Sequence, residues 1–201
     1  MGHIEPAPTS VKEGAAVLPP AVAAFLDDAM EWARGRMWIP RALLLAYLVY
    51  ADFRFFWNPD RGTIFSGITL AFHEMGHLIF AFAGHFVCAL MGSGMQVLVP
   101  IIVIVVFLRQ PDYFGVSVGG FWLSFSLFEL ARYVADARAM DLPLVGFSDD
   151  PEHDWHYLLG AVHMLPLDHL FAFLIRVVAF GAGTASFAFA LLLLLRMWKT
   201  R

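Results

Sequence analysis

Long apolar stretches separated by short polar ones make up most of this chain from residue 38 onward. A helix needs about 20 mostly apolar residues to cross a lipid bilayer. Five stretches approach that length and predict membrane-spanning helices, at 38–57, 62–84, 90–108, 114–137 and 169–197. One substantial polar segment, 138–168, separates the fourth of these from the fifth. The pattern predicts an all-α, polytopic membrane protein of about five transmembrane helices.

The region before the first predicted span has a different character. Residues 1–20 are rich in Pro, Ala and Glu and end in Pro19-Pro20, which predicts a disordered tail. Residues 21–36 carry apolar side chains at helical spacing and acidic ones on the opposite side, which predicts an amphipathic helix at the membrane interface or against a partner. The remainder, 37–201, is predicted to be one membrane-embedded domain.

Composition agrees with this division. The chain is 60% hydrophobic and 15% charged, whereas soluble domains are about 45–50% apolar and about 25% charged. A net charge of −4 gives no indication of nucleic-acid binding. We therefore expect an integral, multi-pass protein of the bacterial inner membrane that contacts the lipid bilayer.

The basic residues do not predict an orientation of the chain, and if residues 156–167 dip into the membrane the C-terminus could return to the cytoplasm. With the N-terminus in the cytoplasm, five basic residues fall near the cytoplasmic side and six near the other side. The first group is Arg34, Arg36, Arg41, Arg132 and Arg138, and the second is Arg54, Arg61, Arg109, Arg196, Lys199 and Arg201. Such an even division leaves the orientation open.

The sequence His73-Glu74-Met75-Gly76-His77 lies within the second predicted span. Histidines four residues apart project from one helical face and can bind one metal ion. Glu74 is displaced around the helix, where it can act as a base toward a metal-bound water; this is the HExxH arrangement of zinc hydrolases. Ionisable groups inside an apolar span are costly to bury without a partner or a metal. The motif predicts a zinc site, with a histidine cluster that only packs helices as the alternative.

Zinc in hydrolases usually has three protein ligands and one open position, so a further ligand must come from elsewhere. Asp136 is the first candidate, because it ends a polar stripe in the fourth predicted span and such a stripe should face the protein interior. Glu129 lies in the same stripe. The loop cluster of His153, Asp154 and His156 offers an alternative ligand or a carboxylate that orients one.

A short segment after the motif has the composition of a flexible turn or of a substrate contact. It contains Gly92, Ser93, Gly94 and Gln96. Glycines allow close backbone approach, and exposed backbone groups can pair with an extended peptide. We interpret these residues as a candidate contact for a substrate strand.

The arrangement over about residues 62–137 resembles the core of the intramembrane zinc metalloproteases, the site-2 protease family. An HExxH motif in a span, one intervening span and then an aspartate at the end of a third carry the resemblance. It implies that His73, His77 and Asp136 bind Zn²⁺, that Glu74 is the catalytic base, and that the substrate is a membrane protein or peptide. A non-catalytic subunit of a larger membrane complex, and a zinc hydrolase acting on lipid, stay open as alternatives.

Overall fold

The computed structural model describes residues 19–57, 62–144 and 152–201, and the described residues form helices and connecting segments without strands. The predicted tail 1–20 lies almost wholly outside the described residues. Seven α-helices are present in these ranges: α1 (Pro20–Ala33), α2 (Ile39–Trp57), α3 (Ser66–Phe80), α4 (His85–Arg109), α5 (Tyr113–Ala135), α6 (Asp154–Ala161) and α7 (Asp168–Lys199). The all-α prediction is confirmed.

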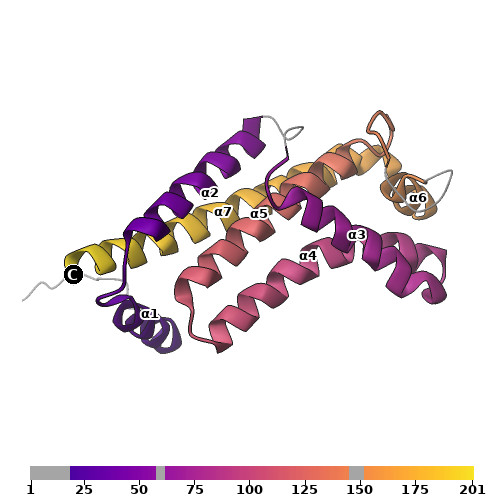
Figure 1. Cartoon of the computed structure of the whole chain (residues 1–201). Coiled ribbons are helices and arrows are strands. Elements are labelled where there is room, and N and C mark those ends of the chain that lie inside the picture. Colours follow the sequence, from indigo (N-terminus) through magenta and orange to yellow (C-terminus); the bar gives the residue numbers. More distant parts are fainter. Residues whose placement is uncertain (1–18, 58–61, 145–151) are drawn as a thin grey trace, which may run out of the picture.

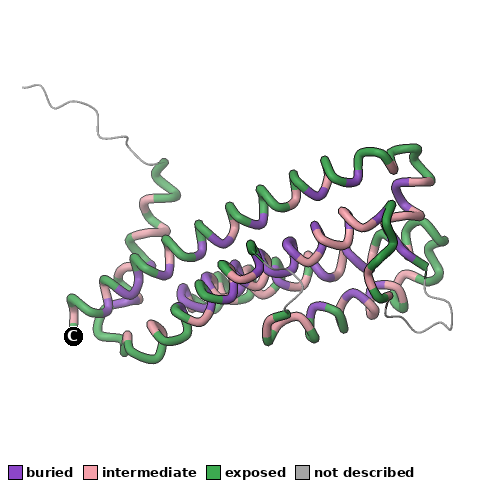
Figure 2. Tube along the Cα trace, turned by 90° about the horizontal axis from the view of Figure 1, so that it is seen from above, coloured by how far each residue is buried: buried purple, intermediate pink, exposed green. Residues whose placement is uncertain are grey.

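Helix α5 forms the centre of the molecule, and α2, α4 and α7 lie along it (Figure 1). Within an apolar stretch of 18 residues in each helix, 72% of the stretch is buried in α5, against 22% in α4 and 33% in the segment that contains α7. Phe121 and Phe125 of α5 are almost fully buried, and Phe125 stacks on Phe55 of α2. The outward faces of the surrounding helices are mostly exposed (Figure 2) and carry many large apolar side chains. That surface is the one expected of a protein that contacts lipid.

Three helices are long and apolar enough to cross a membrane: α4, α5 and the segment Leu165–Lys199 that contains α7. Of the five predicted spans, these are the third, fourth and fifth. The first corresponds to α2, which has 19 residues but includes Arg41, Asp52 and Arg54. The second yields only the 15 residues of α3, because a 3₁₀ turn and then Gly84 end the helix. Gly84 has φ +87°, a backbone conformation that suits glycine and allows the sharp turn into α4.

The predicted amphipathic helix corresponds to α1, and its apolar face packs within the chain. Phe25 contacts Tyr113 of α5 and Phe189 of α7, with ring centroids 5.5 Å away in both cases. Ala29 and Ala33 are fully buried, whereas Asp27 and Asp28 are exposed. The apolar side of α1 is therefore largely used inside the molecule.

Two ends of the molecule can be distinguished (Figure 1). Helix α1 and the C-terminus lie at one end, and α3 and α6 lie at the other. Helix α3 begins where the Thr63 hydroxyl accepts a hydrogen bond from the Phe65 backbone N–H and the Ser66 hydroxyl accepts one from the Thr63 N–H. These two bonds fix the turn that leads into α3, and the histidine motif on this helix lies at the end of the molecule away from α1 and the C-terminus.

Candidate metal site

Both motif histidines project from one face of α3, as their spacing predicts. Their Nε2 atoms lie 3.1 Å apart. His73 is buried and His77 half-buried, so the pair faces the protein interior at the junction of α3 with α4 and α6.

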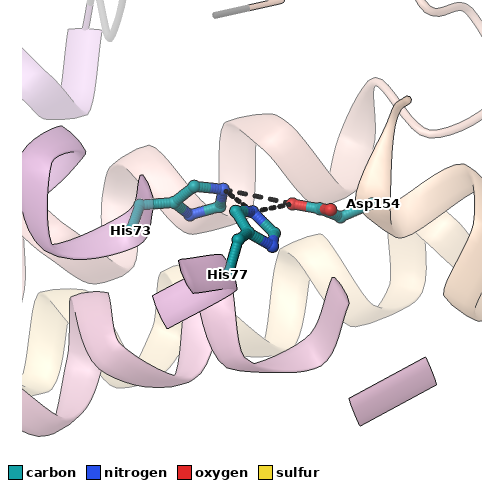
Figure 3. Close-up of side chains that lie close together, drawn as sticks. All are labelled: His73, His77 and Asp154. Carbon is teal, nitrogen blue, oxygen red and sulfur yellow. Dashed lines mark hydrogen bonds and ion pairs between the residues drawn. The ribbon is translucent and has the colours of Figure 1, made fainter. Parts of the chain in front are cut away.

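Asp154, the first residue of α6, supplies a carboxylate to this pair (Figure 3). Its Oδ2 atom lies 3.1 Å from Nε2 of His73 and 3.3 Å from Nε2 of His77. Three potential ligand atoms thus form a nearly equilateral triangle. Ligand atoms bound tetrahedrally to zinc at about 2.0–2.1 Å are separated by about 3.3–3.4 Å, so the triangle has nearly the size that one zinc ion requires.

The hydrogen bonds on the far side of each ring determine which nitrogen carries the proton. Nδ1 of His77 lies 3.1 Å from the Cys88 carbonyl oxygen, which can only accept, so this nitrogen carries the hydrogen. Nδ1 of His73 lies 3.3 Å from Oε1 of Gln96. The Gln96 amide nitrogen donates to the Ser126 carbonyl, which orients Oε1 toward His73 and makes this Nδ1 a donor too.

In its neutral form, each imidazole therefore directs the Nε2 lone pair toward Asp154. Two such lone pairs and a carboxylate oxygen within 3.3 Å repel one another unless a metal ion lies among them or one ring is protonated and donates to Asp154. Two imidazole nitrogens and a carboxylate oxygen form a common donor set for catalytic zinc. The residues present could therefore hold a metal ion such as zinc, and Gln96 and Cys88 orient the two histidines.

Helix α6 is held firmly at this position. The Tyr133 hydroxyl accepts a hydrogen bond from the Asp154 backbone N–H, and the Trp155 indole donates to the Ser93 hydroxyl, both at 3.0 Å. Nδ1 of His156 donates to the carbonyl oxygen of Ala137. Burial alone would raise the pKa of the Asp154 carboxyl, but the neighbouring imidazoles of His73 and His77 outweigh it and hold this pKa below its ordinary value. Asp154 is thus a carboxylate at neutral pH, as a metal ligand must be.

Asp136, the predicted third ligand, lies elsewhere. One of its carboxylate oxygens accepts from the Asp141 backbone N–H, and the other from the Leu142 N–H and from Nε2 of His153 at 3.3 Å. Helix α5 ends at Ala135, so Asp136 caps the turn that follows instead of facing the histidines. The structure therefore places Asp154 at the site where Asp136 was predicted.

The other candidate ligands also have different surroundings. Glu129 accepts a hydrogen bond from the Ser66 hydroxyl. His153 stacks on Tyr133 and caps α6 by accepting from the His156 backbone N–H. Burial lowers the pKa of His153 below its ordinary value, although the Asp136 carboxylate partly offsets this. His153 is therefore largely neutral at pH 7 and supports α6 through its hydrogen bonds.

The predicted substrate-strand segment lies inside α4, where its backbone groups serve the helix. Gly92, Ser93 and Gln96 are buried, and Gly94 adjoins them. The structure therefore gives this segment no free strand edge, and its residues support the candidate metal site instead. Two of them, Ser93 and Gln96, make the contacts to α6 and His73 described above.

Two glycines allow α3 and α4 to approach closely at the site. A Cβ atom on Gly76 would collide with the Met91 carbonyl oxygen. A Cβ atom on Gly92 would lie 2.5 Å from Nε2 of His77 and 2.9 Å from Nε2 of His73. Gly92 therefore keeps free the space in front of both ligand nitrogens.

We expect Gly92→Ala to abolish zinc binding, because the added methyl group occupies that space. The measurement is zinc per chain after purification. Gly94→Ala is the matched control, since its Cβ would meet only the flexible Met91 side chain at 3.0 Å. Both changes raise helix propensity by up to about 1 kcal/mol. Equal zinc content in the two variants would contradict the assigned position of the metal.

A cavity of about 340 Å³ opens beside the ligands, between α3, α5 and the segment after α5. His73 and Glu74 line it together with Glu129, Arg132 and Tyr133, and its apolar wall consists of Leu70, Leu142, Pro143 and Leu144. Glu74 is half-buried and, like His73, lines this space, which is large enough for a bound molecule.

Tyr133→Phe should lower zinc affinity about tenfold, because the ring stays while the acceptor for the Asp154 N–H is lost. Competition with a chromogenic chelator measures the change. Tyr157→Phe is the control, since the Tyr157 ring stacks on His85 and its hydroxyl can be removed while the Asp154 N–H keeps its bond to Tyr133. If both variants bind zinc with the same affinity, Tyr133 does not support the candidate metal site.

Comparison of the chain with known protein families, with curated proteins and with solved structures finds no match.

Proposed function

We propose that this protein is a membrane-embedded zinc metallopeptidase that hydrolyses peptide bonds of membrane-associated substrates. The observation that carries the proposal is the meeting of two imidazole lone pairs and a carboxylate within 3.3 Å beside Glu74. A structural zinc site is usually closed by four protein ligands, whereas a catalytic one keeps a position open. Three protein ligands next to a cavity fit the catalytic kind.

His73, His77 and Asp154 would hold the ion. When bound, zinc polarises a carbonyl group and lowers the pKa of a coordinated water toward about 7. Glu74 borders the same cavity as His73, so its carboxylate can take the proton from the attacking water. The same carboxyl group can then protonate the amine that leaves when the peptide bond breaks.

The cavity supports a peptide as the substrate. Its apolar wall of leucines and proline suits the side chains of a membrane segment, and Ser66, Glu129 and Arg132 form its polar side. A peptide in helical form hides the carbonyl that must be attacked, so the substrate segment would have to unwind before it binds here.

The apolar surface supports a location in the membrane. We propose a multi-pass protein of the bacterial inner membrane, in which α2 accompanies the three helices that are long and apolar enough to cross. The one carboxylate in the middle of α2, Asp52, faces inward and accepts a hydrogen bond from Ser124 of α5 at 2.7 Å. Placing this charge among the helices avoids exposing it to lipid.

Metal analysis of the purified protein tests the proposal. We expect about one zinc per chain, lost in His77→Ala and retained in Glu74→Gln, because only the former removes a ligand. Purification in buffer containing zinc gives every variant the same opportunity to bind. Wild-type protein that carries no zinc under those conditions would rule out the peptidase.

A further inference from the structure

The two ends of the helix bundle differ in the basic residues they carry. At the end opposite the metal site, the Gly35 backbone N–H donates to Thr200 Oγ1 at 3.1 Å and the Arg201 guanidinium lies 5.6 Å from the Trp38 ring centre. These contacts join the end of α1, the start of α2 and the end of α7. The start of α5 joins the same end, because Tyr113 contacts Trp32. We call this the terminal end of the bundle.

The terminal end holds most of the basic side chains. Seven of the eleven described Lys and Arg residues lie there: Arg34, Arg36, Arg41, Arg109, Arg196, Lys199 and Arg201. The other four are Arg54, Arg132, Arg138 and Arg176. Of these, Arg132 lines the cavity, and Arg138 pairs with the buried Asp168 at 2.7 Å.

Tryptophans accompany the basic residues at the terminal end. The Arg36 guanidinium lies 4.2 Å from the ring centre of Trp32, and Trp198 is exposed. Trp beside Lys and Arg is typical of the level at which a membrane protein meets the lipid headgroups.

The structure also changes which basic residues are expected on the same side of the membrane. Helix α3 has 15 residues, and α4 returns beside it after Gly84. His77 of α3 contacts the start of α4 through the Cys88 carbonyl, and His85 pairs with Glu152 next to α6 at 2.7 Å. At the start of α3, the Ser66 hydroxyl donates to Glu129 in the last two turns of α5. Both ends of α3 therefore lie in the half of the bundle that holds the metal site, so α3 does not cross. One side of the membrane then carries all seven basic residues of the terminal end: Arg34, Arg36, Arg41, Arg109, Arg196, Lys199 and Arg201.

We propose that the terminal end lies at the cytoplasmic face of the membrane and that the metal site opens toward the opposite, non-cytoplasmic side. Short segments next to membrane helices carry more Lys and Arg in the cytoplasm, and anionic lipids of that leaflet attract them. The inference rests on the membrane location in the proposed function and not on catalysis. It defines the partner as a membrane-protein segment that reaches the cavity from the non-cytoplasmic side.

Single cysteines at two exposed methionines test the orientation. Met37 lies between α1 and α2 at the terminal end and is 74% exposed, and Met140 lies just after α5 at the site end and is 51% exposed. A membrane-impermeant maleimide should label Met140→Cys in intact cells and Met37→Cys only after permeabilisation. Wild-type protein gives the background from Cys88. The reverse pattern, or equal labelling of both positions in intact cells, would overturn the proposal.

Reporters fused after Arg201 give a second measurement that does not depend on added cysteines. A fluorescent protein that folds in the cytoplasm should be bright there, and alkaline phosphatase, which is active only outside, should be inactive. An active phosphatase fusion would overturn the proposal. Repeating the labelling in His77→Ala separates orientation from metal binding, since the same pattern is expected there even if the protein is no peptidase.

Discussion

Asp154→Asn should remove most of the zinc, whereas Asp136→Asn should leave the site occupied. Asparagine keeps the shape of the side chain and the backbone N–H that binds Tyr133, but it loses the negative charge and most of the ability to bind zinc. Changes to residues that only support ligands lower metal affinity by about 10–100-fold. The loss of a direct ligand should exceed about 100-fold.

Asp136→Asn tests the competing assignment directly. Asp136 contacts His153, which caps α6, so its replacement acts on Asp154 only through His153 and should lower zinc affinity about tenfold at most. Chelator competition on both variants, with circular dichroism to verify that each stays helical, gives the comparison. If Asp136→Asn strips the zinc and Asp154→Asn retains it, the ligand set is His73, His77 and Asp136.

The hydrophobic pattern predicted the helices, because burial in the protein and contact with lipid both require long apolar stretches. Where the pattern misled, the cause was a local break. The apolar run 62–84 has the length of a span, but the 3₁₀ turn and Gly84 end α3 after 15 residues. Ala81, Phe82 and Ala83, which form the 3₁₀ turn, give no sign of that break, because all three residues are compatible with a continuing α-helix.

The histidine pair was predictable because its four-residue spacing acts within one helix. The third candidate ligand could be named only as an alternative, within the cluster of His153, Asp154 and His156, since its position depends on where α6 docks. A polar stripe on α5 favoured Asp136, yet the helix ends one residue before it. One feature of the sequence did point to Asp154. In His153-Asp154-Trp155-His156, four consecutive side chains can form hydrogen bonds, and in the structure each contacts a neighbouring element. Such density in a loop indicates a segment that docks.

Glu74→Gln should retain fold and zinc yet abolish turnover of a membrane-embedded substrate. Glutamine has nearly the shape of glutamate and can hydrogen-bond water, but it cannot accept a proton. Loss of a general base typically costs about 10²–10⁴ in rate, and more where the same group must protonate the leaving amine. Because Glu74 follows a ligand directly and lines the cavity, its carboxylate can reach the attacking water without occupying the metal.

The comparison uses cells that produce wild type or the Gln variant at equal levels, followed by proteomics of the membrane fraction. A substrate should accumulate at full length with Glu74→Gln and be shortened with wild type, which would also identify it. Glu31→Gln is the matched control, since Glu31 is exposed on α1 and pairs with Arg34 far from the site. If no membrane protein differs while both forms bind zinc and enter the same larger complex, the peptidase proposal fails and a non-catalytic subunit takes its place. If the shortened product is a lipid and no polypeptide changes, the same site is a lipid hydrolase.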